Sequence, residues 1–208
     1  MKKKLITICA MVSVILMSTS VATAVFTADP DAFSDGTDIS NAFAGVTLSA
    51  VGSGWDSPSG AILAQDPTIE SEPFTPSTGD LAFGTDDGMF PHLFREDRLQ
   101  FRADFAGPVS FVSLDFIGND DDGDDVGVLK AYDSGGSLLA SDFTSSLLSD
   151  EVETLSLSVG GIAYILAFGS RPETVGIDNL QWIPAPGAIL LGSLGVGLVG
   201  WLRRRRTL

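Results

Sequence analysis

Hydrophobic and polar residues alternate in short stretches along the middle of the chain. From Val46 onward, runs rich in Val, Ile, Leu and Phe are broken by Gly, Asp, Ser and Pro, and no helical period lasts longer than a turn or two. The alternation is clearest in residues 99–105 and 112–116. Because successive side chains of a strand point to opposite faces, each of these segments predicts a β-strand with one buried face.

Glycine pairs separate several of these segments. Gly135-Gly136 lies between residues 126–133 and 137–143, and Gly160-Gly161 lies between residues 152–159 and 162–168. Glycine accepts the positive φ that tight turns require, so both arrangements predict antiparallel hairpins. A last strand is expected over residues 175–182, and the Pro-, Ser- and Gly-rich stretch 52–79 predicts a surface loop or a short hairpin. The predicted fold is therefore all-β, a single antiparallel sandwich.

The amino-terminal end has the pattern of a secretory signal peptide. Three lysines at positions 2–4 precede an apolar run over residues 5–17, and Ala22 and Ala24 are spaced as in an Ala-x-Ala cleavage site. An apolar run this short does not span about 30 Å of hydrocarbon. We therefore expect residues 1–24 to be removed by signal peptidase after passage through the Sec translocon.

The carboxyl-terminal end, residues 183–208, has three parts. A proline motif over residues 183–187 contains Pro184, Ala185, Pro186 and Gly187, an apolar Gly-rich segment follows over residues 188–202, and the chain then carries Arg203, Arg204, Arg205 and Arg206. At 1.5 Å per residue the apolar segment is about 22 Å long as a helix. It predicts a transmembrane helix whose arginines stay in the cytoplasm, which leaves residues 25–182 outside.

This three-part tail resembles the PEP-CTERM sorting signal of Gram-negative bacteria. The resemblance implies recognition by an exosortase, a membrane transpeptidase-like enzyme of organisms that usually make exopolysaccharide. The commonest motif of the family is Val-Pro-Glu-Pro, and this chain departs from it in lacking the glutamate, although Pro-Ala-Pro-Gly variants also look like members. A plain single-span anchor is the alternative, with the same topology.

Residues 25–182, called the body below, show weaker resemblances at their two ends. Residues 176–180 (Gly-Ile-Asp-Asn-Leu) look like the endings of many PEP-CTERM sandwich domains and of jelly-roll modules related to carbohydrate-binding domains. The opening, residues 35–49, also resembles the way such domains begin. The resemblance implies a jelly-roll-like sandwich.

Charge and cysteine content exclude several functions. Residues 25–182 hold 5 positive and 27 negative charges, a net of −22. Such a field repels nucleic acid, and it favours either solubility or binding of divalent cations and basic partners. Cys9 lies within the predicted signal peptide. The exported protein would therefore have no disulfide, thiolate metal site or catalytic cysteine.

The acidic loop, residues 119–125, is the strongest candidate for a metal site. Carboxylates so close together need solvent or a hard cation, and Ca²⁺ binds six to eight oxygens. We expect Asp120, Asp122 and Asp124 either to bind calcium or to form a solvated turn. A second candidate calcium site uses Asp178 and its neighbour Asn179, near the last strand, with an aspartate near the first, Asp35 or Asp38, as jelly-roll modules often hold calcium where the chain ends meet.

Evidence for catalysis is weak in this sequence. His92 is the only histidine and has no evident orienting partner, no serine lies in a Gly-x-Ser-x-Gly turn, and carboxylates are too abundant for any pair to be informative. Among the aromatic residues, Tyr164 and Trp182 are expected in or beside the core, which leaves Trp55 as the exposed candidate for stacking on a sugar.

The sequence favours a non-enzymatic protein of the cell surface or extracellular matrix, associated with extracellular polysaccharide. The alternative is a calcium-stabilised carbohydrate-binding module, and the third hypothesis is an extracellular hydrolase. The sequence names no ligand.

Overall fold

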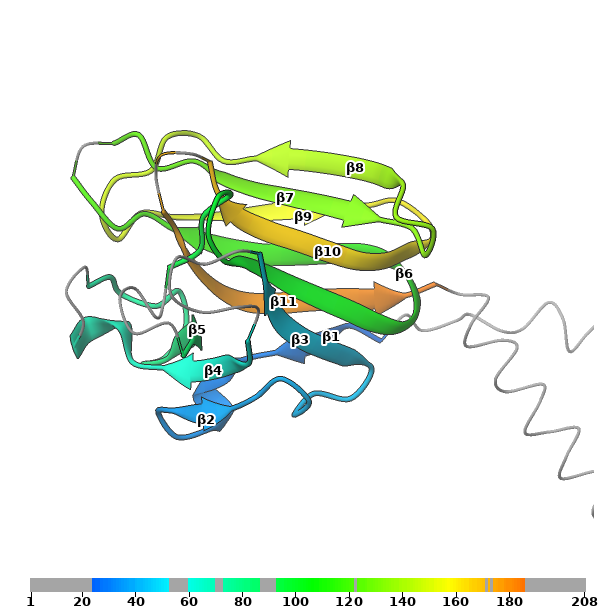
Figure 1. Cartoon of the computed structure of the whole chain (residues 1–208), viewed down its shortest axis with the longest axis horizontal. Helices are drawn as coiled ribbons and strands as arrows, with labels where there is room; N and C mark the ends of the chain where they lie inside the picture. The colour runs from blue at the N-terminus through cyan, green and yellow to red at the C-terminus, as the bar shows by residue number, and fades with distance from the viewer. Residues whose placement is uncertain are drawn as a thin grey trace, which may run out of the picture.

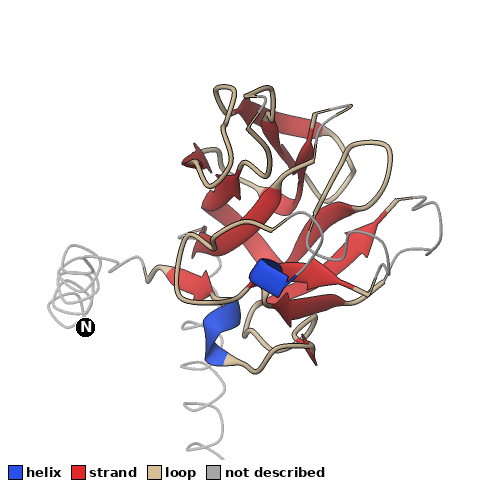
Figure 2. Ribbon diagram, turned by 90° about the vertical axis from the view of Figure 1, so that its left-hand side faces the viewer, coloured by secondary structure: helices blue, strands red, loops and turns tan. Residues whose placement is uncertain are grey.

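Strands account for nearly all the regular structure of this protein. The computed structural model describes residues 24–52, 60–69, 73–86, 93–121, 123–170, 172 and 174–185. Within these ranges the only helical elements are two short 3₁₀ turns, η1 (Pro30–Ala32) and η2 (Pro67–Ile69) (Figure 2). The strands are β1 (Phe26–Ala28), β2 (Thr37–Asp38), β3 (Val46–Val51), β4 (Ile62–Gln65), β5 (Ala82–Thr85), β6 (Gln100–Ile117), β7 (Gly127–Tyr132), β8 (Leu138–Phe143), β9 (Val152–Leu157), β10 (Ile162–Gly169) and β11 (Gly176–Pro184).

The long strand β6 organises the fold because it belongs to two layers. Its first half, residues 100–105, pairs with β3 and β10, and its second half, residues 109–117, pairs with β11 and β9. The residues between the halves, 106–108, are exposed. Figure 1 shows β6 passing from one layer to the other. The two predicted strands over residues 99–105 and 112–116 are thus one continuous element.

The two layers form a sandwich around one core. One layer has the strand order β3-β6-β10-β7-β8 and the other has β1-β11-β6-β9, with all neighbours antiparallel. Their inward side chains form a single hydrophobic cluster that includes Phe101, Leu114, Phe116, Ile165 and Trp182. The prediction of an all-β antiparallel fold is confirmed.

A small third sheet and a covering segment lie against this sandwich. Strands β2, β4 and β5 pair antiparallel, and Phe83 of β5 packs on Phe101 with ring centroids 4.9 Å apart. The segment 73–81 lies over the second half of β6, where Phe74 and Ile117 belong to a separate buried cluster. The stretch 52–79, expected to be a loop or a hairpin, therefore contributes a strand and part of this cover.

Two predictions about pairing have different outcomes. The β7–β8 hairpin is confirmed, and Gly136 at its turn has φ +81°. The predicted hairpin between residues 152–159 and 162–168 is wrong, because β9 pairs with β6 in one layer while β10 pairs with β6 and β7 in the other. The glycine turn at residues 160–161 carries the chain between layers, so that Leu155 and Ile165 both reach the core.

The ends of the folded part lie side by side. Phe26 of β1 pairs with Trp182 of β11, and their rings stack with centroids 5.7 Å apart. Strand β11 continues past the predicted domain end at residue 182, since Pro184 pairs with Val109 and Ala185 N–H donates to the Pro108 carbonyl at 2.9 Å. No helix within the described residues is long and apolar enough to span a membrane, and the predicted helix over residues 188–202 lies outside them.

Candidate functional site

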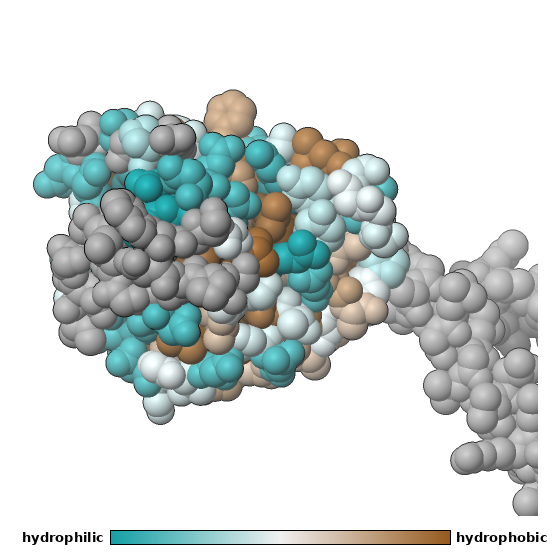
Figure 3. All heavy atoms as spheres, viewed as in Figure 1, coloured by the Kyte–Doolittle hydropathy of each residue, from teal (hydrophilic) through white to brown (hydrophobic). Residues whose placement is uncertain are grey.

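The outward face of the five-stranded layer carries a regular array of side chains. Strand register places three rows across β3, β6, β10, β7 and β8, and Figure 1 looks onto this layer. The first row is Thr47, Asp104, Tyr164, Tyr132 and Leu138. The second is Ser49, Arg102, Leu166, Lys130 and Ser141. The third continues the same spacing with two register-paired groups, Val51 and Gln100 on one side and Phe168, Val128 and Phe143 on the other, and Phe168 is only 3% exposed. The same view of the surface mixes hydrophobic and hydrophilic residues (Figure 3).

Two tyrosines form the centre of the first row. The rings of Tyr132 and Tyr164 stack with centroids 4.8 Å apart and an interplanar angle of 6°. Both side chains are half-buried, and within the described residues neither hydroxyl has a hydrogen-bond partner. Burial, and then the neighbouring Tyr164, raises the pKa of Tyr132 above its ordinary value. Tyr164 was expected in or beside the core and instead lies on this outward face, whereas Trp182 is in the core as predicted.

An arginine–carboxylate pair extends this aromatic centre. The Arg102 guanidinium lies 3.9 Å from the Tyr164 ring centroid, and its Nε and Nη2 donate to the two Asp104 carboxylate oxygens, both at 2.6 Å. The hydrogen bonds to Asp104 raise the pKa of Arg102 above its ordinary value. Two of its five N–H donors are used in this way, and the others remain for a ligand. The pair therefore sets fixed donors beside fixed acceptors.

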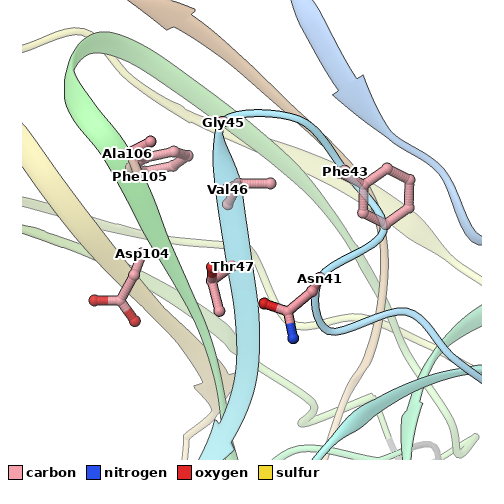
Figure 4. A pocket seen from close by; sticks show the side chains of 8 residues that line it. All are labelled: Asn41, Phe43, Gly45, Val46, Thr47, Asp104, Phe105 and Ala106. Carbon is pink, nitrogen blue, oxygen red and sulfur yellow. The ribbon is translucent and has the colours of Figure 1, made fainter.

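A hollow continues the row beyond Asp104. It has a volume of about 360 Å³, and its lining includes Asn41, Thr47 and Asp104 on one side and Phe43 and Ala106 on the other. Figure 4 shows Asp104, Thr47 and Asn41 in succession beside the hollow, carried by β6, by β3 and by the segment before β3. Asn41 and Thr47 are exposed. Polar groups thus extend from the hollow to the tyrosine pair.

A second, buried polar cluster lies on the other layer, beneath the segment 73–81. Asp178 of β11 and Asp115 of β6 are register partners, and they are 0% and 6% exposed. Ser77 Oγ lies 2.8 Å from Asp115 Oδ2 and 2.9 Å from Asp178 Oδ2. Thr78 N–H also donates to Asp178, and Thr154 Oγ1 donates to Asp115.

The two carboxyl groups of this cluster share one hydroxyl proton, that of Ser77. Carboxylates directly opposite each other on neighbouring strands repel. The Ser77 hydroxyl has one proton for two carboxyl groups, so the second contact is a hydrogen bond only when a carboxyl group is protonated. Burial raises the pKa of Asp178 to about 6 despite the hydrogen bonds from Thr78, Ser77 and Asn179, which lower it. Asp178 therefore holds a proton at mildly acidic pH.

The acidic loop brings together two of the three predicted carboxylates and adds Asp125. Asp120, Asp124 and Asp125 have carboxylate oxygens within 4.8 Å of one another, and Asp122 lies outside the described residues. Asp125 is 0% exposed, and its Oδ2 accepts from the Asn119 N–H at 2.7 Å. The three groups offer only oxygen ligands, the kind that Ca²⁺ prefers.

The other predicted site residues lie in different places. Asp178 is in the cluster with Asp115, while Asp35 and Asp38 accept from Asp66 N–H and Ser40 N–H in and beside the small sheet. Ala24 is the first described residue and is exposed, and Pro184 and Ala185 are half-buried at the end of β11. The remaining predicted residues lie outside the described ranges: Ala22, Trp55, His92, Asp122, Pro186, Gly187, Arg203, Arg204, Arg205 and Arg206.

Comparison with known proteins gives similarities of backbone shape. No protein-family model matches the chain, and no curated protein matches its sequence. The K2 cleaved adhesin domain of Lys-gingipain has a TM-score of 0.48 and 12% identity, covering 76% of this chain and 99% of that one. A fucose-binding module of Streptococcus pneumoniae has a TM-score of 0.35 and 12% identity, covering 73% and 97%. TmCBM61, solved with β-1,4-galactotriose, has a TM-score of 0.32 and 13% identity, covering 67% and 83%.

Proposed function

We propose that this protein binds carbohydrate on the outward face of its five-stranded layer. The observation that carries the proposal is the first row, in which a stacked tyrosine pair continues into Arg102, Asp104 and Thr47. Sugar rings have apolar C–H faces and a rim of hydroxyls that donate and accept hydrogen bonds. Because Tyr164 lies between Arg102 and Tyr132, the proposed aromatic contacts are the ring edges and the face of Tyr132 turned away from Tyr164, with the fixed donors and acceptors beside them for the hydroxyls.

The dimensions of the row also suit a short oligosaccharide. The row crosses from β3 to β7 through β6 and β10, and at about 4.8 Å between neighbouring strands this is about 14 Å. The hollow beside Asn41 extends the row at one end. The strands hold these groups rigidly, which lowers the entropy lost when a ligand binds.

The test is glycan binding by two tyrosine variants. We expect Tyr132→Ala and Tyr164→Ala each to weaken binding about tenfold, since each removes aromatic contact area worth about 1.4 kcal/mol. Affinity electrophoresis and glycan arrays measure the loss. Leu148→Ala, at a residue 51% exposed outside the three rows, is the matched control. Glycan binding that survives both tyrosine substitutions at full strength would disprove the proposed site.

We propose a binding role without catalysis. A glycosidase needs two carboxyl groups that reach the sugar. Asp115 and Asp178 are buried under the segment 73–81 and are held by its hydroxyl and amide groups, so they make no contact with a ligand on the surface. Absence of released sugar when the protein is incubated with the glycans it binds is the expected result.

We further propose export through the Sec translocon and sorting of the tail by an exosortase to the envelope or matrix of a Gram-negative bacterium. The sequence patterns at both ends support this route. Strand β1 begins at Phe26 and β11 ends at Pro184, so cleavage at the predicted signal site keeps every described strand.

Calcium binding by the acidic loop is a second proposal, and the convergence of Asp120, Asp124 and Asp125 favours it. Millimolar Ca²⁺ should raise the melting temperature more than Mg²⁺ or NaCl at equal ionic strength, because Mg²⁺ demands a smaller octahedral site. At 100 times the dissociation constant the gain is about 2.7 kcal/mol. Asp124→Asn should reduce the Ca²⁺ effect. Equal shifts with all three salts would leave a solvated acidic turn.

A further inference from the structure

Acidic residues are almost absent from the proposed binding face, although the body carries a net charge of −22. Across the three rows the only acid is Asp104, and Arg102 neutralises it through two hydrogen bonds. Acids therefore gather elsewhere on the molecule. A solubilising acidic surface alone gives no reason for one face to be spared.

Two of the few cations of residues 25–182 lie on this same face. The body has five, of which Arg171 is outside the described residues, and two of the other four, Arg102 and Lys130, lie in the second row. They are separated by β10, a distance of about 10 Å at the usual strand spacing. Both are two residues from a member of the first row on their own strand, Asp104 and Tyr132. Any ligand on the tyrosine pair lies within reach of both.

Lys130 is the cation whose charge is available. Arg95 pairs with Asp97 and Arg102 with Asp104, whereas Lys130 forms no ion pair with any acid that the structure describes. Its Nζ lies 4.9 Å from the centroid of the Phe168 ring, which is 3% exposed. This contact holds the ammonium on the face and leaves its hydrogen-bond donors without a carboxylate.

We infer that the glycan bound on this face is anionic, and that Lys130 receives its negative group while the tyrosine pair contacts the sugar rings. The inference rests on the proposed function. Arg102 has N–H donors that Asp104 does not use, and Lys130 has no carboxylate partner in the described structure. An anion held between these two side chains would neutralise the remaining positive charge of the face. The anionic group is a carboxylate of a uronic acid or a sulfate ester, since both fit a lysine and a guanidinium.

The test compares matched ligands on the purified full chain. The ligands are a galacturonate oligosaccharide, the same oligosaccharide after reduction of its carboxyl groups, and a sulfated neutral oligosaccharide of equal length. Calorimetry is done in EDTA, so that a cation on the acidic loop cannot bridge protein and ligand. We expect the anionic ligands to bind about 3- to 10-fold more tightly than the neutral one, the range for one half-exposed ion contact. The ratio of the dissociation constants of the galacturonate and the sulfated oligosaccharide then shows which anionic group, carboxylate or sulfate, the face prefers.

Substitutions at Lys130 distinguish this inference from the proposed function. Lys130→Gln should remove the preference for anionic ligands and keep neutral binding, and Lys130→Arg should restore the preference. Arg95→Gln, the same charge change outside the rows, should preserve it. Equal binding of neutral and anionic ligands by the unmodified protein, or an unchanged preference in Lys130→Gln, would overturn the inference while leaving carbohydrate binding intact. Failure of every glycan to bind would refute the proposed function itself.

Discussion

Replacing Asp178 by Asn should change how the stability of the protein depends on pH. Burial raises the pKa of this carboxyl group from 3.8 to about 6. The folded state therefore keeps the proton at pH values where the unfolded state has lost it. Stability from this group is complete below about pH 4 and is lost as pH rises through about 6. At 1.36 kcal/mol per pKa unit the loss is about 3 kcal/mol.

The asparagine variant is neutral at every pH, but it has one oxygen where the carboxylate has two. Asp178 Oδ2 accepts from Thr78 N–H and Oδ1 accepts from Asn179 N–H. The amide satisfies one of these donors and turns its NH₂ group toward the other, which costs about 1 kcal/mol. The variant should thus be about 1 kcal/mol less stable than the original protein at pH 4 and about 2 kcal/mol more stable at pH 8.

Urea unfolding at fixed ionic strength, from pH 4 to pH 8, measures this difference. Asp142→Asn is the control, because Asp142 is exposed and its side chain accepts only from the N–H of Phe143 in the described structure. At pH 8 it makes the same change in net charge as Asp178→Asn, and it should keep the original pH dependence. If Asp178→Asn followed the same pH dependence as the control, the assignment of a buried, proton-binding carboxyl group would be incorrect.

Three further predictions concern packing and processing. Gly127→Ala should lower the free energy of unfolding by about 1–3 kcal/mol in thermal melts, because the added Cβ would lie 2.3 Å from Phe116 Cδ1. Gly160→Ala is the control and should be nearly neutral, because a Cβ at that position would have no neighbour within 4 Å. N-terminal sequencing of the exported protein should begin at Val25, and retention of the first methionine would contradict the signal peptide. Intact-mass measurement on surface-extracted protein should show loss of the segment that contains the four terminal arginines; a mass that includes them in cells with an exosortase would favour a simple anchor.

The sequence predicted individual strands better than their pairing. Alternation is a local property, so the strands around residues 99–105, 127–132 and 176–182 appear where the pattern places them. Pairing depends on which layer a strand joins. The pair Gly160-Gly161 looks like a hairpin turn, yet the strands on either side of it bury their apolar residues in opposite layers of the same core.

The buried acid pair could not be predicted for a related reason. Alternation over residues 112–116 suggested that Ser113 and Asp115 face solvent, but both are 6% exposed. Ser77 and Thr78 cover Asp115 and Asp178 from a segment that precedes Asp115 by 38 residues and Asp178 by about 100. A polar strand face can be buried under this segment because its hydroxyl and amide groups donate hydrogen bonds to the buried carboxyl oxygens.

The proposed binding face was missed because it exists only in the strand register. Thr47, Asp104, Tyr164 and Tyr132 lie on four strands that are far apart in sequence, and no local motif joins them. A usable signal was present only for Arg102, which alternates with the buried Phe101 and Ala103. In residues 162–168 alternation does not mark Tyr164, because the buried Ile162 and Phe168 share its parity. Selecting Trp55 for its place in a loop used no information about strand faces.

The charge of the whole chain and the charge of one face lead to different expectations about partners. A net of −22 implies long-range repulsion of anions, but at physiological ionic strength the Debye length is about 8 Å. A ligand lying across the tyrosine row is therefore governed mainly by the nearest groups, and within the three rows the charged side chains are Arg102, Asp104 and Lys130, with a sum of +1. Lower salt lengthens the reach of the remaining acids and should weaken binding of an anionic glycan, the reverse of the effect expected for a basic protein. Weaker binding at lower salt would show that the distant acidic residues repel the anionic glycan while the nearby cations attract it.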